Sequence, residues 1–593
     1  MDKVKIKING VETEVIKNTT VLAAAKELGI KIPTLCSFHI PNIGFVNSHA
    51  SCRICVVEIN GSENLYPACE TRVQEGMSII TNSTELLHVR KSILELILSN
   101  HPKDCLICSK SGECELQKLA EEFKIKRIRF EGEQTKYRID HSPAIIRNMD
   151  KCIMCRRCET MCNKIQTCNV LSAVNRGFES VIAPSHEKNL EDTNCTFCGQ
   201  CVAVCPVGAL HERDYTWEAI DAVADKTKKV VVQVAPAVRV ALGEEFGYEP
   251  GTDVSGKMVS ALKRLGFDYV FDTNFAADLT IMEEASELKE RIEKYLAGDK
   301  KVKLPILTSC CPAWVKFIEH NYPDMLDVPS TAKSPQQMFS SVAKEFWTKE
   351  LGIKREEMVV VSIMPCLAKK YEASREEFSK DGNPDTDISI STRELASMIK
   401  QSGINFDMLP DTEFDNPFGM SSGAADIFGR TGGVIEAATR TAYEWITGNT
   451  LENVDFVQLR GLEGVRIAEV PELQIEGKNL RIGIAHGLGS ARELLDKVRS
   501  GEEVLHAIEI MACKGGCIGG GGQPYHHGDF EIIKKRFEGI QAIDDNKAMR
   551  KSHDNPYIKE LYEKYLGKPL GHKSHELLHT SYFSRGKNID KDR

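Results

Sequence analysis

Cysteines are the residues of this chain best suited to chemistry: there are 21 among 593 residues, and most stand in groups two or three residues apart. Thiolates at such spacing ligate zinc or iron–sulfur clusters. The chain begins MDKVKIKING, an alternating stretch with no apolar signal region, so we expect it in the cytoplasm, where thiols stay reduced. The groups therefore predict metal ligation rather than disulfides, although any one set of four could hold zinc.

Two runs share the spacing CxxCxxCxxxC, which is the strongest local signal in the sequence. In this pattern the fourth cysteine of each run ligates the other cluster. We therefore predict two [4Fe–4S] clusters, one held by Cys152, Cys155, Cys158 and Cys205 and the other by Cys195, Cys198, Cys201 and Cys162. The repeat predicts a pseudo-twofold module and leaves Cys168 as a structural residue.

A third set combines His101 with Cys105, Cys108 and Cys114, directly after a helix predicted over residues 82–100. A histidine before Pro102 would by itself be a capping or surface group. Followed by three cysteines at ligand spacing, it is predicted to be the fourth ligand of a [4Fe–4S] cluster. Imidazole in place of a thiolate makes a cluster less negative, which should raise its reduction potential.

The first set along the chain lies in a small mixed segment, with strands predicted over 3–8 and 12–16 and a helix over 21–28. Its ligands are Cys36, Cys52, Cys55 and Cys69, in an arrangement that resembles the plant-type [2Fe–2S] ferredoxins. The gap between the first two cysteines is longer than in the commonest spacing. It contains His39 and His49, which we interpret as loop residues, with a mixed histidine and cysteine site as the alternative.

Nothing up to residue 218 acts on a substrate, because these four sets only carry electrons. This part of the chain resembles the iron–sulfur subunit of respiratory complex I, including its histidine-containing set. The residues that follow alternate strand-like and helical stretches, for instance MVVVSIMPC, RIGIAHGLGSARELLDKV and HAIEIMACKGGC. Such alternation predicts an α/β domain with parallel strands. Its cysteines come just after the strands, where these folds place active sites.

Three motifs occur in this domain in the order TSCCPAW, MPCLAKKYE and EIMACKGGCIGGGGQP. Together they closely resemble the signature motifs of the catalytic domain of [FeFe]-hydrogenases, and with the accessory sets the resemblance covers essentially the whole chain. It implies an H-cluster, a [4Fe–4S] cube held by Cys311, Cys366, Cys513 and Cys517. The last of these would bridge to a diiron unit that carries carbon monoxide, cyanide and an amine-bearing dithiolate. Cys310 would then carry protons to that amine.

Residue types around the motifs suit the implied pocket. Lys369 is predicted to donate a charge-assisted hydrogen bond to one cyanide, with groups near Ala235 and Pro236 facing the other. Met364 and Met511 would supply a soft apolar wall.

The third motif also contains glycines at 515, 516 and 519–522. A glycine run is usually a flexible loop, but here we predict packed backbone that approaches the cluster and donates N–H groups to its sulfurs. Lys514 stands where many relatives have proline. It is not a ligand, so this departure bears on redox tuning more than on the reaction.

A proton path is also implied by the resemblance, since a pocket that excludes water needs a relay. Glu284 and Glu287 are three residues apart and can share one face of a helix. The implied path runs from solvent through Glu287, Ser330 and Glu284 to Cys310. Without the family, a solvated helix face would be the better interpretation of the two glutamates.

We therefore predict an α/β and α+β multidomain protein, with ferredoxin-like iron–sulfur modules over 1–81, 82–140 and 141–218 and a large α/β H-cluster domain over 219–593. Its cofactors would be the H-cluster, three further [4Fe–4S] clusters and one [2Fe–2S] cluster. It would catalyse 2H⁺ + 2e⁻ ⇌ H₂. The alternative is a non-catalytic hydrogen-sensing relative, but such relatives typically lack the proton cysteine or a cluster ligand, and here all are present.

The electron partner stays open at this point: ferredoxin, flavin-bearing NAD(P)H-oxidising subunits, or both. A net charge of −9 without a basic stripe argues against a nucleic-acid partner. The chain has no run of about eighteen apolar residues, which argues against a membrane span.

Overall fold

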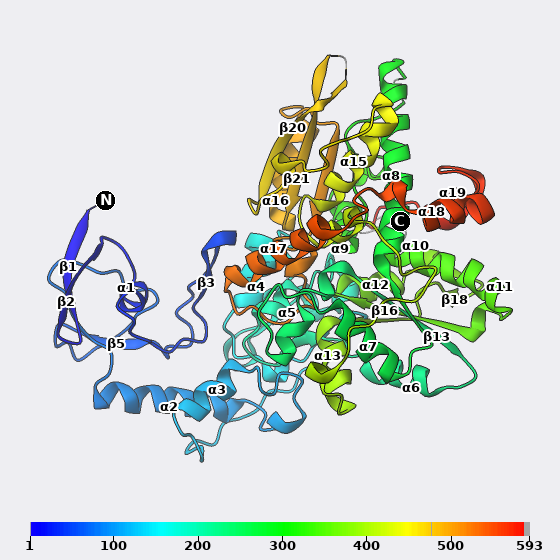
Figure 1. The fold of residues 1–593 in the computed structure, drawn as a ribbon. Coiled ribbons are helices and arrows are strands. Elements are labelled where there is room, and N and C mark those ends of the chain that lie inside the picture. Colours follow the sequence, from blue (N-terminus) through cyan, green and yellow to red (C-terminus); the bar gives the residue numbers. More distant parts are fainter. Residues whose placement is uncertain (1, 300, 476, 586–593) are drawn as a thin grey trace, which may run out of the picture. The chain divides into compact units, whose positions relative to one another are not determined.

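The computed structural model describes residues 2–299, 301–475 and 477–585 (Figure 1). The chain divides into two compact units. The first unit comprises residues 1–165, 169–193 and 201–211, and the second comprises residues 166–168, 194–200 and 212–593. The four domain boundaries expected from the sequence are finer than this division and stay predictions.

The N-terminal part of the first unit is a five-stranded sheet in the order β2–β1–β7–β5–β6. Its strands are β1 (Lys3–Ile8), β2 (Val11–Ile16), β5 (Val56–Ile59), β6 (Leu65–Pro67) and β7 (Ser78–Ile80). Alternate residues of β1 are buried and share one apolar core with α1 (Val21–Glu27). The Thr20 hydroxyl caps this helix by accepting the N–H of Ala23 at 3.2 Å. The two strands and the helix predicted here are confirmed.

Short elements carry the other cysteines of the first unit. The helix predicted over 82–100 is confirmed as α2 (Thr84–Asn100), which Ser83 caps by accepting the N–H of Leu86 at 3.2 Å. His101 follows its last residue and is the C-cap residue of the helix. The elements that follow are α3 (Glu115–Glu122), β8 (Asp140–His141), β9 (Ile145–Arg147), α4 (Arg157–Thr160), β10 (Ser172–Val174) and β11 (Val181–Ala183).

The second unit contains two four-stranded sheets. One is parallel throughout and runs β14–β13–β16–β19, with β13 (Lys229–Val234), β14 (Tyr269–Asp272), β16 (Met358–Met364) and β19 (Ile388–Ser391). The other runs β15–β22–β21–β20, with β15 (Ile306–Leu307), β20 (Val465–Ile475), β21 (Lys478–His486) and β22 (Ala507–Met511). In it β20 and β21 are antiparallel and the other pairs are parallel. The predicted parallel α/β arrangement is confirmed, but the sequence did not indicate that the strands divide between two sheets.

The helix α8 (Thr273–Leu296) follows β14 and positions the two predicted glutamates. Asp272 caps it by accepting the N–H of Asn274 at 3.0 Å. It contacts α10 (Pro335–Val342) and α15 (Gly433–Thr447), and its first four turns are almost entirely buried (Figure 1). Buried carboxyl groups on such a helix need partners, so Glu284 and Glu287 do not lie on a solvated face.

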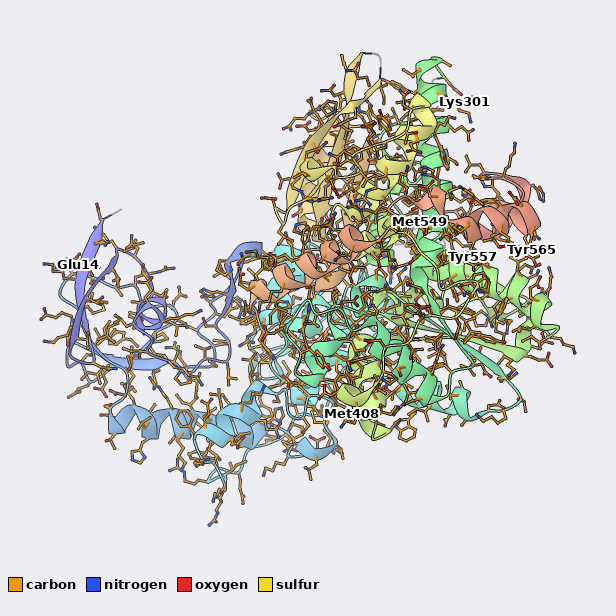
Figure 2. The ribbon with its side chains drawn as sticks, viewed as in Figure 1. Glu14, Lys301, Met408, Met549, Tyr557 and Tyr565 are labelled. Carbon is orange, nitrogen blue, oxygen red and sulfur yellow. The ribbon has the colours of Figure 1, made fainter. Side chains whose placement is uncertain are left out.

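Further helices of the second unit are α7 (Ser255–Leu265), α9 (Pro312–Asn321), α13 (Thr392–Gln401), α16 (Leu488–Ser500) and α17 (Phe530–Asn546), with the shorter α12 (Ala368–Ala373), α18 (Pro556–Leu561) and α19 (His572–Leu578). Among them, α7, α12 and α13 contact the parallel sheet and α16 contacts the other. Side chains fill the space between these elements, while Met408 and Lys301 lie exposed (Figure 2). No helix among the described residues combines the length and apolar character needed to cross a bilayer.

Candidate active site

Four cysteines of the second unit come together where loops leave the ends of strands. Cys311 caps α9, Cys366 follows β16 and Cys513 follows β22, with Cys517 four residues further on. Burial raises the pKa of Cys513 far above its ordinary value, and the thiolates of the other three raise it further. Burial raises the pKa of Cys517 as well, and the thiolates of Cys311 and Cys366 raise it further. Cys366 and Cys513 are buried, and Cys311 and Cys517 are half-buried. Four thiolates this close together would repel one another without cations between them, so this donor set fits an iron–sulfur cube.

The glycines of the third motif are packed against backbone, as predicted. A Cβ on Gly520 would lie 2.1 Å from the carbonyl oxygen of Pro365, directly before the ligand Cys366. Gly516 has φ +95°, and a Cβ there would lie 2.6 Å from the backbone nitrogen of Thr431. Only glycine fits these positions, and the loop is therefore rigid around the cysteines.

Cys310 is buried beside this set. Burial raises the pKa of its thiol far above the usual range, and the neighbouring Glu284 carboxyl raises it further. The thiol is therefore protonated at neutral pH. A protonated thiol can give a proton to a base and take one back from an acid.

Glu284 and Glu287 lie close together on α8 but have different partners. Burial raises the pKa of Glu284 to about 8. Its Oε1 lies 3.3 Å from both the backbone nitrogen and the hydroxyl of Ser309, and its Oε2 has no partner within the described part of the chain. Glu287 accepts hydrogen bonds from the Ser330 hydroxyl at 2.8 Å and from Arg291 at 2.6 Å. The structure thus joins Ser330 to Glu287.

Lys369 is fixed by its neighbours. Its Nζ donates to the carbonyl oxygen of Cys310 at 3.2 Å and to Oε2 of Glu372 at 2.8 Å. The same oxygen of Glu372 accepts from Ser334 and Gln336, both at 2.9 Å. Although burial opposes it, the Glu372 carboxylate keeps the pKa of Lys369 above its ordinary value. The ammonium is therefore charged and held beside Cys310.

The predicted apolar wall lies at the ends of three strands. Met364 ends β16 and Met511 ends β22, and each is about 2 % exposed. Ala235 and Pro236 follow β13 and are buried. The N–H of Ala235 donates to the carbonyl oxygen of Ile363 at 3.1 Å, and proline has no N–H. These two residues can therefore line the pocket, but their own amides are not the donors to a diatomic ligand.

Residues in and near the second CxxCxxCxxxC run contact the third-motif loop, which carries Cys513 and Cys517 in the same unit. The Sγ of Cys513 lies 4.0 Å from the carbonyl oxygen of Cys198. Gln200 donates to the carbonyl oxygen of Gly519 at 3.1 Å, and Gln166 donates to that of Ala512 at 3.0 Å. Nothing in their spacing marked these two glutamines, because the contacts span more than 300 residues.

The two CxxCxxCxxxC runs share one backbone conformation. Met154 and Arg156 in the first run have positive φ, as do Phe197 and Gly199 at the same positions of the second. In each run the third residue donates its N–H to the first sulfur, Met154 to Cys152 at 3.4 Å and Phe197 to Cys195 at 3.5 Å. Burial raises the pKa of Cys155, and Cys205 raises it further, which places the fourth cysteine of the second run beside the first run. The local backbone conformation therefore repeats in the two runs, and the exchange of ligands between them stays a prediction.

The first set also converges. The Cys36 thiol lies beside those of Cys52 and Cys69, the Cys69 thiol lies beside that of Cys55, and all four thiols are free. His39 bonds Ser48 at 3.0 Å and His49 bonds Thr160 at 3.2 Å instead. The interpretation of both histidines as loop residues is confirmed for His49 and wrong for His39, which lies in the strand β3 (Phe38–Ile40).

One ring nitrogen of His101, the predicted fourth ligand, makes no hydrogen bond among the described residues. Its Nδ1 contacts the carbonyl oxygen of Pro102 at 2.9 Å, and its Nε2 is buried without a partner among the described residues. Burial lowers the pKa of this imidazole, which keeps it neutral as a metal ligand must be. Cys108 and Cys105 raise the pKa of Cys114, after burial, so the three thiols lie near one another.

Cys168 and Lys514, which belong to no predicted ligand set, make hydrogen bonds to nearby groups of the protein. The Sγ of Cys168 bonds the carbonyl oxygen of Gln166 at 3.5 Å and lies 3.8 Å from the Thr196 hydroxyl, which fits a structural thiol. Lys514 donates to the hydroxyl of Ser490 at 3.1 Å.

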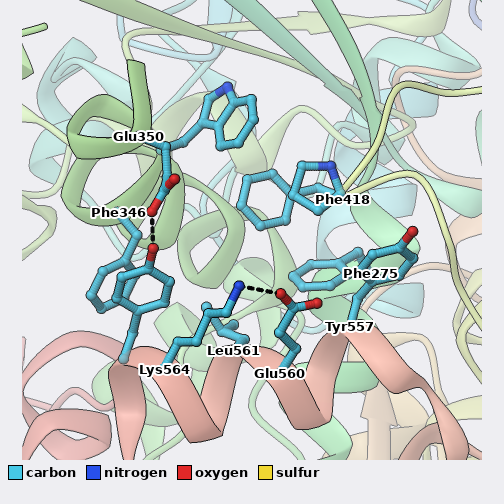
Figure 3. Close-up of a pocket in the computed structure, with 11 residues that line it drawn as sticks. Phe275, Phe346, Glu350, Phe418, Tyr557, Glu560, Leu561 and Lys564 are labelled. Atoms are coloured by element: carbon cyan, nitrogen blue, oxygen red, sulfur yellow. Dashed lines mark hydrogen bonds and ion pairs between the residues drawn. The ribbon is translucent and has the colours of Figure 1, made fainter. Parts of the chain in front are cut away.

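Two cavities lie near α8. One, of about 360 Å³, is lined by Glu287, Arg291, Thr331 and His575, with Lys301 at its rim. The other, of about 130 Å³, is aromatic and contains none of the predicted site residues (Figure 3). It lies between α18 and the side chains of Phe275 and Phe418. The first cavity therefore opens at Glu287, the outer glutamate of the predicted proton path.

Comparisons with known proteins agree with this geometry. Residues 228–521 match the C-terminal domain of the iron-only hydrogenase large subunit, and residues 530–585 match the iron hydrogenase small subunit. Residues 1–84 match a 2Fe-2S iron–sulfur cluster binding domain, 90–129 the NADH-ubiquinone oxidoreductase-G iron–sulfur binding region, and 142–211 the ferredoxin-like domain of NADH-quinone oxidoreductase subunit 3. The small-subunit part had not been recognised in the sequence.

Two curated relatives and one solved structure are similar to the chain. The NADP-reducing hydrogenase subunit HndD of Solidesulfovibrio fructosivorans is 62% identical over 99% of this chain and 100% of its own length. Iron hydrogenase 1 of Clostridium pasteurianum is 38% identical over 97% of this chain and 99% of its own. A variant of the [FeFe]-hydrogenase HydA1 from Chlamydomonas reinhardtii covers 63% of this chain and all of its own, with 42% identity and a TM-score of 0.57.

The chain therefore belongs to the [FeFe]-hydrogenases, the iron-only hydrogenase large-subunit family. It is an oxidoreductase with iron–sulfur cofactors, in which complex I-like iron–sulfur modules precede the hydrogenase domain.

Proposed function

We propose that this chain interconverts protons, electrons and molecular hydrogen, 2H⁺ + 2e⁻ ⇌ H₂, at an H-cluster held by Cys311, Cys366, Cys513 and Cys517. The observation that carries the proposal is a buried thiol, Cys310, that lies beside this donor set and the buried Glu284 carboxyl. When bound, the cluster supplies two-electron redox chemistry with hydrogen. The chain itself supplies the protons, the fixed charges and the electron path.

Protons are exchanged with solvent at Glu287, which lines the cavity beside Arg291. They pass through Ser330 and Glu284 to Cys310. A carboxyl with a pKa of about 8 is about nine-tenths protonated at pH 7, so Glu284 can donate, and its unpartnered Oε2 is free to meet the thiol. A general acid or base works best when its pKa lies near the working pH, which this one does.

Lys369 would hold one cyanide ligand through a charge-assisted hydrogen bond. Glu372 and the Cys310 carbonyl fix its ammonium, so the donor is oriented before the cofactor binds. Replacing Lys369 by methionine should leave Glu372 buried without its cation and lower the yield of assembled cluster.

Electrons would reach this site from the cluster that Cys195 and Cys198 help to hold. Support comes from the 4.0 Å separation between the Cys198 carbonyl oxygen and the Cys513 sulfur. The other accessory sets would extend the relay, with one [2Fe–2S] and three [4Fe–4S] clusters in all. The need for reduced thiols favours the cytoplasm as the compartment.

A protein partner would deliver electrons to the His101 set. Leu106 and Ile107, between two ligands of this set, are 98% and 85% exposed, and exposed apolar pairs mark interaction sites. We favour a flavin-bearing NAD(P)H-oxidising subunit as this partner, because the relative HndD is named a subunit of an NADP-reducing hydrogenase. Ferredoxin is the alternative donor.

The catalytic proposal is tested with anaerobically matured protein. We expect infrared bands of iron-bound carbon monoxide and cyanide, together with hydrogen evolution from a reduced viologen dye. Cys310→Ala should keep the bands and lose turnover, whereas Cys168→Ala, which changes a thiol outside the site, should keep both. Matured protein with the bands but without hydrogen evolution would refute the proposal.

The partner proposal is tested by replacing Leu106 and Ile107 together with serine. Nucleotide-linked hydrogen evolution with co-purified subunits should fall, and viologen-linked evolution should not change. Met408→Ser is the matched control, because Met408 is 76% exposed but lies in the second unit. Equal nucleotide-linked rates in the double variant and the control would reject docking of the partner at Leu106 and Ile107.

A further inference from the structure

One buried ammonium of the second unit has no carboxylate partner. Five lysines in the described part of this unit are buried: Lys316, Lys333, Lys344, Lys369 and Lys370. Four of them lie within 3.6 Å of a carboxylate oxygen, whereas Lys316 makes no ion pair or hydrogen bond with any described residue. Glu319, three residues further along α9, is already paired with Arg375 at 2.8 Å and with Arg585 at 2.6 Å. A buried charge without a partner is costly, so we expect another anion beside Lys316.

Lys316 instead faces two aromatic rings from distant parts of the sequence. Its Nζ lies 4.4 Å from the ring centre of Phe197 and 4.3 Å from that of Tyr371. The two ring centres are 5.2 Å apart, and α9 contacts α12, which carries Tyr371. The negative face of an aromatic ring attracts a cation. The rings therefore fix the position of the ammonium, but they carry no net charge that could neutralise it.

Phe197 connects this ammonium to a predicted iron–sulfur ligand. The ring is fully buried, and the backbone N–H of Phe197 donates to the Sγ of Cys195 at 3.5 Å. Burial lowers the pKa of Lys316 to about 8, and the thiolate of Cys195 is the strongest influence that opposes this, ahead of Glu319. The ammonium is therefore charged at neutral pH. The anion that it lacks among the carboxylates is the ligand set to which Cys195 belongs.

We propose that Lys316 is the fixed counter-charge of the [4Fe–4S] cluster that Cys195 and Cys198 help to hold, and that it raises the reduction potential of this cluster. The inference rests on the proposed function, in which this cluster passes electrons to the H-cluster. A cluster ligated by thiolates is anionic, and it gains one more negative charge when it accepts an electron from another accessory cluster. A buried cation stabilises the reduced form more than the oxidised form, so the reduction occurs at a less negative potential.

The variant Lys316→Met removes the charge and keeps most of the length of the side chain. In a paramagnetic resonance titration of the matured protein, one midpoint should move to a more negative potential and the others should stay. At the potential where the wild-type cluster is half reduced, we expect the ratio of reduced to oxidised cluster to fall about tenfold, which is about 59 mV for one electron. Cys195→Ser changes a ligand of the cluster and should alter the same signal, which identifies it.

Two further variants separate the charge from the packing of the side chain. Lys316→Arg keeps the charge and should keep most of the wild-type potential. Lys349→Met is the matched control, because Lys349 also lies over a ring, that of Phe346 at 5.6 Å, but its ammonium is exposed and paired with Glu345. It should change no midpoint. Equal midpoints in Lys316→Met and the wild type, or a shift in a signal that Cys195→Ser leaves unchanged, would overturn the inference.

Cluster assembly gives a second readout, which serves if Lys316→Met does not hold its iron. Loss of the Cys195 signal in both Lys316→Met and Lys316→Gln, with retention in Lys316→Arg, would show that the cluster needs the cation and would support the inference. Loss in all three variants would mean that the shape of the lysine matters rather than its charge, and would overturn it. The potential is measured without hydrogen turnover, so a wild type that evolved no hydrogen would refute the proposed function and leave this test intact.

Discussion

Replacing Glu284 by glutamine tests the central feature of the site, a carboxyl that burial keeps protonated. Its pKa is raised from 4.5 to about 8, which corresponds to about 5 kcal/mol between the two protonation states. Between pH 4.5 and 8 the folded chain holds this proton while the unfolded chain has released it. Stability therefore falls as pH rises through this window, by about 3 kcal/mol at pH 7. Glutamine cannot ionise, so Glu284→Gln should be free of this loss and should also stop proton transfer.

The assay is an infrared pH titration of the protonated carboxyl band. In the wild type the band should persist at pH 7 and disappear with a midpoint near pH 8, and in Glu284→Gln it should be absent. Glu283→Gln is the matched control one position earlier: although burial opposes it, hydrogen bonds from His579, Ser574 and Tyr562 hold the pKa of Glu283 below its usual range. That variant should keep the band. A midpoint near 4.5, or a band that survives in Glu284→Gln, would refute the assignment.

Other predictions concern the ligands and their backbone. Cys310→Ser should lower turnover at least about a hundredfold, because an alcohol is a much weaker acid than a thiol, and hydrogen assays with intact infrared bands check this. His101→Cys adds negative charge to its cluster and should lower that cluster's reduction potential in a paramagnetic resonance titration; an unchanged potential would exclude His101 as a ligand. Gly520→Ala places a Cβ 2.1 Å from the Pro365 carbonyl, so iron content per chain should fall, and full occupancy would contradict the packed loop.

The ligand sets are the part of the site that sequence predicts in most detail, and the local structure around them agrees with the prediction. The cysteines of one set lie within a short stretch of chain. The same positive-φ positions recur in both CxxCxxCxxxC runs because a short loop has few ways to direct three sulfurs toward one cluster. His101 was marked by three cysteines after it, and its buried, unpartnered nitrogen agrees. Strand and helix periodicity likewise predicted β16, β21, α16 and β22, because these patterns are read within one element.

Contacts between distant segments could not be predicted in the same way. Tyr582 meets Ser330 across 252 residues, and Gln166 meets Ala512 across 346. The residues around the tyrosine in HTSYF or the glutamine in KIQTC do not indicate which distant residue either of them contacts. The division of the strands between two sheets was missed for a related reason, since periodicity identifies a strand without saying which strand lies beside it.

Two adjacent cysteines show how the fold assigns chemistry that residue type leaves open. Burial raises the pKa of both Cys310 and Cys311. Backbone groups of Ala512, Trp314 and Ala313 then lower that of Cys311, which caps α9 and so faces the N–H groups of its first turn. Cys310 instead faces Glu284, which raises its pKa further. We therefore expect Cys311 to be the thiol that binds iron and Cys310 the one that keeps a proton, because the chain turns into a helix between them.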